Sequence, residues 1–177
     1  MPHRKLLTPV RTSGLRRLSE RNPASSVGLA ALDIDHHLVQ VALGILENEI
    51  NFETRGETLE NSIRFLIDYT DQHFTREESL MRGIGYPDLD GHKSSHDIMR
   101  AWMDASLPEI GSVRNPHYDD DVVAYLYDWW DTHAGKEDKG YADFIKERLS
   151  EAQRIAARLP PIDVPAYLTA CAPFEIR

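Results

Sequence analysis

The sequence has little cysteine and no long apolar run. Cys171 is the only cysteine among 177 residues, which excludes an internal disulfide framework and suits a reducing compartment. No segment approaches the ~20 apolar residues that a membrane-spanning helix needs, and the basic N-terminus has no apolar stretch typical of a secretory signal. These absences predict a soluble, cytoplasmic protein that makes no membrane contact.

Positive charge is also scarce, since the formal net charge is -9. Residues 1–27 carry six basic side chains and one acidic one, so the negative excess lies in the rest of the chain. An acidic body repels phosphate groups, so nucleic acid is not an expected partner. The sequence leaves open whether a protein partner contacts the terminal segments.

Period-two alternation is absent as well, and strands are therefore not expected. Apolar positions instead recur at steps of three and four along 32–50, 59–80, 92–103 and 122–133, which predicts four helices, the last opening at Asn115 and Pro116. Short links favour an all-α, antiparallel up-down four-helix bundle over residues 28–158. Residues 1–27 form an N-terminal arm in this prediction, and 159–177, with four prolines, form a C-terminal tail.

Polar residues with metal-ligand chemistry occupy the core-facing stripes of all four predicted helices. The histidines among them are His36, His73, His92, His96 and His133. Burying imidazoles is costly unless something in the interior satisfies them. Hydrogen bonds alone would satisfy any single buried histidine. The presence of such histidines on every predicted helix favours a shared metal site.

The spacing of these residues fits one site. His73 and Glu77 are four residues apart, as are His92 and His96, so each pair shares one helix face. Imidazole together with carboxylate suits iron, manganese or zinc. The adjacent His37 and Glu78 are expected to point away, because a helix turns ~100° per residue.

Four segments resemble the motifs of the hemerythrins: DIDH at 33–36, HFTREESLM at 73–81, HKSSHD at 92–97 and WWDTHAGKED at 129–138. The resemblance covers about residues 28–150 and implies two iron ions joined by an oxo or hydroxo bridge. It assigns His92, His96 and His133 to one iron and His36 and His73 to the other. Glu77 and Asp138 would bridge both irons. One coordination position then stays open on the two-histidine iron, as a ligand-binding metal site requires.

His133 and Asp138 are five residues apart, which separates them by ~140° on a regular helix. The apolar stripe after His133 continues better through Tyr141, Ile145 and Leu149 than in the original register, although Phe144 fits the latter. Both observations indicate one extra residue, a π-bulge, and Gly135 lies where such a distortion costs little packing.

The resemblance implies that the chain binds dioxygen reversibly as a carrier, store or delivery protein and is not an enzyme. Five imidazoles with only two carboxylates agree with this, because the Glu-rich ferritin-like centres that oxidise substrates supply more negative charge. Two alternatives remain open. One is an oxygen or redox sensor that signals through a partner, and the other is a di-iron enzyme acting on peroxide, nitric oxide or ferrous iron.

Phe74, Trp129 and Trp130 are the candidate lining of the dioxygen pocket. Hemerythrins typically have leucine at the position of Trp130 and isoleucine at that of Ala134. Trp130 could simply pack between helices, with Ala134 making room for it. Alternatively, its indole lines the pocket, narrows the route to the open iron and offers an N–H donor that leucine lacks.

Overall fold

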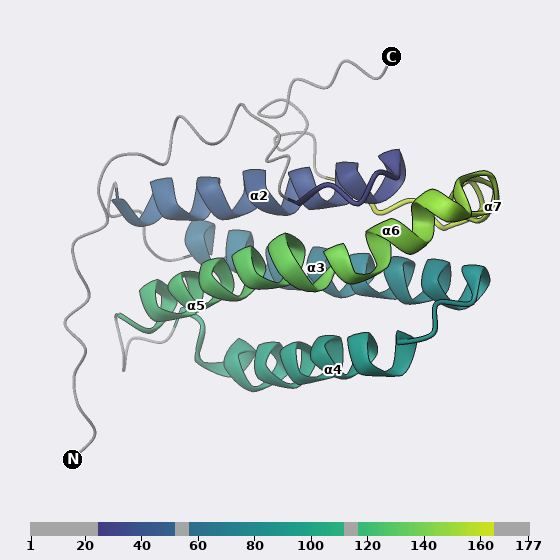
Figure 1. The fold of residues 1–177 in the computed structure, drawn as a ribbon. Coiled ribbons are helices and arrows are strands. Elements are labelled where there is room, and N and C mark those ends of the chain that lie inside the picture. Colours follow the sequence, from purple (N-terminus) through teal and green to yellow (C-terminus); the bar gives the residue numbers. More distant parts are fainter. Residues whose placement is uncertain (1–24, 52–56, 112–116, 165–177) are drawn as a thin grey trace.

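The computed structural model describes residues 25–51, 57–111 and 117–164, and within these ranges it contains helices and no strands. The helices are α2 (Ala30–Asn51), α3 (Glu57–Ile84), α4 (Leu89–Ser106), α5 (Tyr118–Thr132), α6 (Lys139–Glu147) and α7 (Leu149–Ala156). A 3-10 turn (Leu107–Glu109) follows α4, and a π-helical turn (His133–Glu137) joins α5 to α6. The chain reverses direction at each link from α2 to α5 (Figure 1). The predicted antiparallel four-helix bundle is confirmed.

Local sequence explains where α3 ends. Gly85 has φ of 68°, a left-handed conformation that glycine adopts without steric cost. The Tyr86 N–H then donates to the Met81 carbonyl at 2.8 Å, and the Gly85 N–H donates to the Arg82 carbonyl. This is a Schellman motif, which satisfies the last carbonyls of the helix.

The fourth predicted helix differs in detail from the observed one. Its predicted start, Asn115 and Pro116, lies outside the described residues, and α5 begins at Tyr118. Tyr141 and Ile145 are buried as the shifted stripe predicts. Leu149 is 41% exposed, because the helix breaks at Arg148 (φ -125°) and α7 takes a new direction.

The apolar core consists of two clusters, one toward each end of the bundle. The first includes Leu43, Leu66 and Met99, and the second includes Leu32 and Ile145. In sequence, Asp35–His37 on α2, Arg76–Glu78 on α3 and Asp138 between α5 and α6 fall between members of the first cluster and members of the second. The bundle therefore encloses a polar layer between two apolar ones. Within the described residues, no helix is both long and apolar enough to cross a membrane.

Candidate metal centre

The first group of candidate ligands combines two histidines with two carboxylates. His36 lies on α2, His73 and Glu77 lie on α3, and Asp138 follows the π-helical turn. Their ligand atoms all lie within 4.8 Å of one another. The His36 Nε2 atom is 3.3 Å from Glu77 Oε1 and 3.3 Å from Asp138 Oδ2. These four side chains surround a space suited to a single cation.

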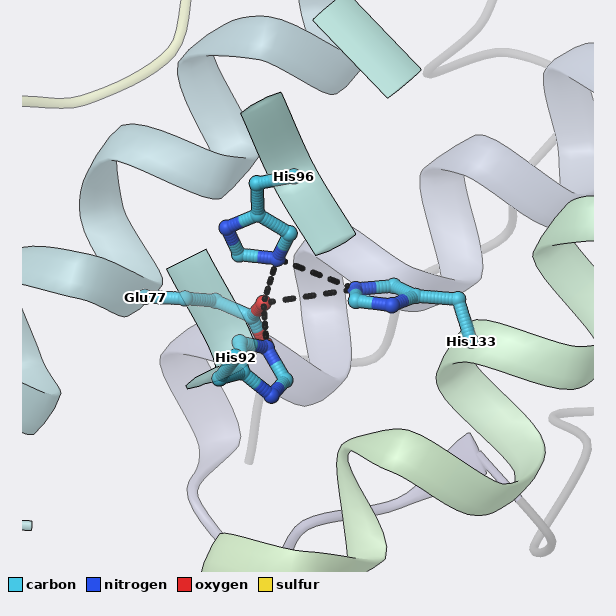
Figure 2. Close-up of side chains that lie close together, drawn as sticks. All are labelled: Glu77, His92, His96 and His133. Carbon is cyan, nitrogen blue, oxygen red and sulfur yellow. Dashed lines mark hydrogen bonds and ion pairs between the residues drawn. The ribbon is translucent and has the colours of Figure 1, made fainter. Parts of the chain in front are cut away.

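The second group places three histidines around the same glutamate. Figure 2 shows His92, His96 and His133 converging on the Glu77 carboxylate from α4 and from the end of α5. The Glu77 Oε2 atom is 3.4 Å from His96 Nε2 and 3.7 Å from His92 Nε2. Asp138 Oδ1 lies 3.2 Å from His133 Nε2 and 3.4 Å from His92 Nε2. Both carboxylates therefore reach both groups of histidines.

Hydrogen bonds among the polar atoms of this centre leave several of them unsatisfied, and a cation would satisfy them. Glu77 and Asp138 are fully buried. Several inward-facing atoms make no hydrogen bond: His73 Nε2, His92 Nε2, Glu77 Oε2 and both carboxylate oxygens of Asp138. Buried polar atoms are rarely left unsatisfied, because desolvation without a partner is costly. Imidazole nitrogens and carboxylate oxygens without partners in one buried space are the donor set of a metal site.

Outer contacts orient the imidazoles of the three-histidine group. His96 donates from Nδ1 to Glu78 Oε1 (3.0 Å), and His133 donates from Nδ1 to Glu137 Oε2 (2.9 Å). Glu78 also accepts from Arg100 (2.7 Å). These contacts occupy Nδ1 of each ring and leave Nε2 facing the centre as the nitrogen that a metal ion would bind in place of a proton.

The two-histidine group is oriented differently. His36 donates from Nδ1 to the Ser25 carbonyl at 2.5 Å. The Nδ1 atom of His73 lies 3.7 Å from the Asp35 carboxylate, which in turn forms a 2.7 Å ion pair with Arg76. A backbone carbonyl and a carboxylate paired with Arg76 therefore support this half, whereas two carboxylates, one of them paired with Arg100, support the other.

The predicted wide turn in the fourth helix is confirmed. Residues His133–Glu137 are π-helical, and the Asp138 N–H donates to the His133 carbonyl five residues earlier (3.1 Å). This turn brings Asp138 back to the face that carries His133. Gly135 is not sterically required there, because a Cβ atom on it would meet nothing within 4 Å.

The pKa values reflect the crowding of charge. Burial acts to raise the pKa of Glu77, but the histidines around it hold that pKa well below its usual range. Burial and the charge of Glu77 raise the pKa of Asp138. Burial acts to lower the pKa values of His36 and His133, but the carboxylates outweigh it and raise them to about 9 and about 10.

Three residues at the centre differ from expectation or were missed. Glu78 was given no role at the centre but binds the outer Nδ1 atom of His96, and His37 is buried instead of solvated. Tyr141 is fully buried and donates its hydroxyl hydrogen to Glu77. Tyr141 follows Asp138 by three residues, so it shares that helix face, and this spacing was the available signal.

Two of the three predicted pocket residues lie beside the three-histidine group. Phe74 stacks on His96 with ring centroids 4.0 Å apart, and Trp129 stacks on His133 at 4.3 Å. Stacking of this kind fixes the ring planes and covers one face of each imidazole.

Trp130 lies beside the other group. Its ring meets His36 and His73 edge to face, with centroids 5.5 Å and 5.7 Å apart. The indole is 4% exposed, and the neighbouring Ala134 is also buried. Trp130 is therefore the indole that contacts the half with fewer imidazoles.

Comparison with known proteins agrees with this geometry. Residues 27–145 match the model of the hemerythrin HHE cation binding domain. A bacteriohemerythrin of Pseudomonas paraeruginosa is 25% identical over 126 residues, covering 71% of this chain and 80% of the relative. One from Stenotrophomonas maltophilia is 24% identical over 137 residues, covering 73% and 82%. One from Methylococcus capsulatus is 34% identical over 76 residues, covering 43% and 57%. No solved structure gave a significant match.

Proposed function

Because this chain belongs to the hemerythrin family, we propose that it binds dioxygen reversibly at a centre of two iron ions. The observation that carries the proposal is the donor set, in which two groups of buried ligand atoms share Glu77. Such an arrangement can hold two cations side by side with a common bridge. Iron would supply electrons that pass to dioxygen on binding and return on release.

Seven side chains hold the metal ions in this proposal. They are His36, His73, Glu77, His92, His96, His133 and Asp138. Five neutral imidazoles and two carboxylates bring little negative charge to the centre, which favours reversible binding over oxidation of substrates. The half held by His36 and His73 has one imidazole fewer, so we place the exchangeable ligand there.

The surrounding chain keeps water from the centre. The apolar clusters close the polar layer from both ends, and Phe74 and Trp129 cover two imidazole faces. A dry site protects reduced iron from oxidation by solvent-assisted routes. Dioxygen is apolar and enters such an interior readily. The single cysteine agrees with a cytoplasmic location.

A sensor is the second candidate, and contacts to both terminal segments favour it. Ser25 accepts from His36, and Arg76, which pairs with Asp35, donates to the Pro160 carbonyl. A ligand that shifts His36 or His73 would therefore act on the residues that lead into the arm and the tail. A protein partner would read that change.

Absorption spectroscopy of the iron-loaded full chain distinguishes these functions. Reversible binding requires two irons per chain and a visible band that appears under air and disappears when oxygen is removed, over repeated cycles. Rapid bleaching to the ferric form with consumption of peroxide or nitric oxide would indicate an enzyme. One iron per chain, or zinc alone when iron is supplied, would contradict the di-iron proposal.

A further inference from the structure

The indole N–H of Trp130 is a buried donor without an acceptor. The side chain is 4% exposed, and its Nε1 atom makes no hydrogen bond. A buried indole N–H usually has a partner. Packing with Ala134 explains where the ring fits, but it does not explain why a donor is kept in a dry interior.

Trp130 lies beside one half of the metal centre. The ring contacts His36 and His73 edge to face and lies farther from His133, at 6.3 Å between centroids. It therefore borders the two-histidine half, where the proposed function places the exchangeable ligand. The His36 Nδ1 atom already donates to the Ser25 carbonyl, so it is not a second donor to that ligand.

The geometry points to Trp130 as a ligand-selecting residue: its indole N–H donates a hydrogen bond to a small ligand that enters the two-histidine half. This inference rests on the proposed function. The ligand class is a small molecule or anion that carries a lone pair on the atom facing the indole, such as dioxygen or azide. Leucine at this position would give shape alone, whereas tryptophan adds a directional donor.

The test uses azide as the probe with the oxidised, iron-loaded full chain. Trp130→Phe removes the donor and keeps an aromatic ring, and Trp130→Leu removes both. Trp102→Phe is the matched control, because the Trp102 ring packs at a tilt on Tyr125, with centroids 4.1 Å apart, and is not among the rings that contact the candidate histidines. Iron content, azide affinity and the position of the azide absorption band are measured for each variant.

We expect Trp130→Phe to weaken azide binding about tenfold, equivalent to about 1.4 kcal/mol, and to shift the azide band at unchanged iron content. Trp102→Phe should match the parent protein in all three measurements. Equal azide affinity and band position in Trp130→Phe and the parent would overturn the inference. If only Trp130→Leu differs from the parent, the ring acts by its shape and the inference is overturned as well. A parent chain that holds two irons but binds no azide overturns the inference and leaves the di-iron centre standing. A parent chain without iron overturns both.

Discussion

At the scale of single residues, His36 and His133 face the carboxylates of Glu77 and Asp138 across a few ångströms. Their pKa values, about 9 and about 10, keep both imidazoles protonated near neutral pH when no metal is bound. Raised histidine pKa values stabilise the metal-free fold below the unfolded value of ~6.5, and this stabilisation is lost as pH rises through 9 to 10. Metal ions and protons therefore compete for the same nitrogens.

Iron uptake at pH 7 should release protons, at least one each from His36 and His133, because a ligating imidazole must be neutral. Apparent iron affinity should accordingly fall as pH decreases. The measurement is an anaerobic ferrous titration in weak buffer with a pH indicator. His117→Ala, at an exposed histidine, should leave the release unchanged, and absence of any acidification would contradict the prediction.

Glu77→Gln and Asp138→Asn should each lose most of the bound iron, since an amide carries no negative charge with which to bridge two cations. Iron per chain after desalting is the measurement. Asp131→Asn alters an exposed carboxylate of α5 and should retain the parent content. Full iron content in both buried variants would show that other residues hold the metal.

Helix periodicity explains how the inner side chains come together, but it does not specify the contacts around them. Spacing of four residues paired His73 with Glu77 and His92 with His96, since it depends only on helix geometry. The contacts of Glu137 with Ser95 and of Glu78 with Arg100 each join two different elements of the bundle. Such pairs depend on how helices are rotated and spaced, which periodicity does not specify.

At the scale of elements, the π-helical turn depends on the number of residues between His133 and Asp138, not on the glycine within it. The resemblance and the shift of the apolar stripe predicted the turn correctly. The break at Arg148 was not predicted, because Leu149 continues the apolar pattern and no proline or glycine marks the end of α6.

Gly135→Ala should stabilise the protein by about 0.4–1 kcal/mol without loss of iron, because the helical backbone there admits a Cβ and the unfolded chain loses freedom. Gly28→Ala is the matched comparison. Its Cβ would also meet nothing within 4 Å, but φ is 78°, so we expect a loss of about 1 kcal/mol or more. Thermal unfolding of both variants tests this, and destabilisation by Gly135→Ala would contradict it.

At the scale of the whole molecule, the bundle includes residues just outside the predicted domain limits of 28–158. Ser25 and Val27 are buried, and Ile162 and Val164 pack against the first apolar cluster. A chain of residues 25–164 should hold iron as the full chain does. A chain of residues 28–158 contains all seven proposed ligands but lacks the carbonyls of Ser25 and Pro160.

We expect the shorter chain to bind iron about tenfold more weakly, since loss of outer hydrogen bonds typically has an effect of this size. Competition with a chelator measures the affinity of both chains. Circular dichroism at matched concentration checks that both are equally helical. Equal iron affinity in the two chains would show that the terminal segments do not support the centre.

Both groups of ligand atoms are completed within one turn of the chain, the three-histidine group at His133 and the two-histidine group at Asp138. During synthesis from the N-terminus, neither group is whole until the ribosome has passed the middle of the last bundle helix. Only five residues then separate the two events. A nascent chain interrupted before that turn lacks Asp138 and cannot form both groups, so iron uptake at this centre indicates that synthesis has passed residue 138.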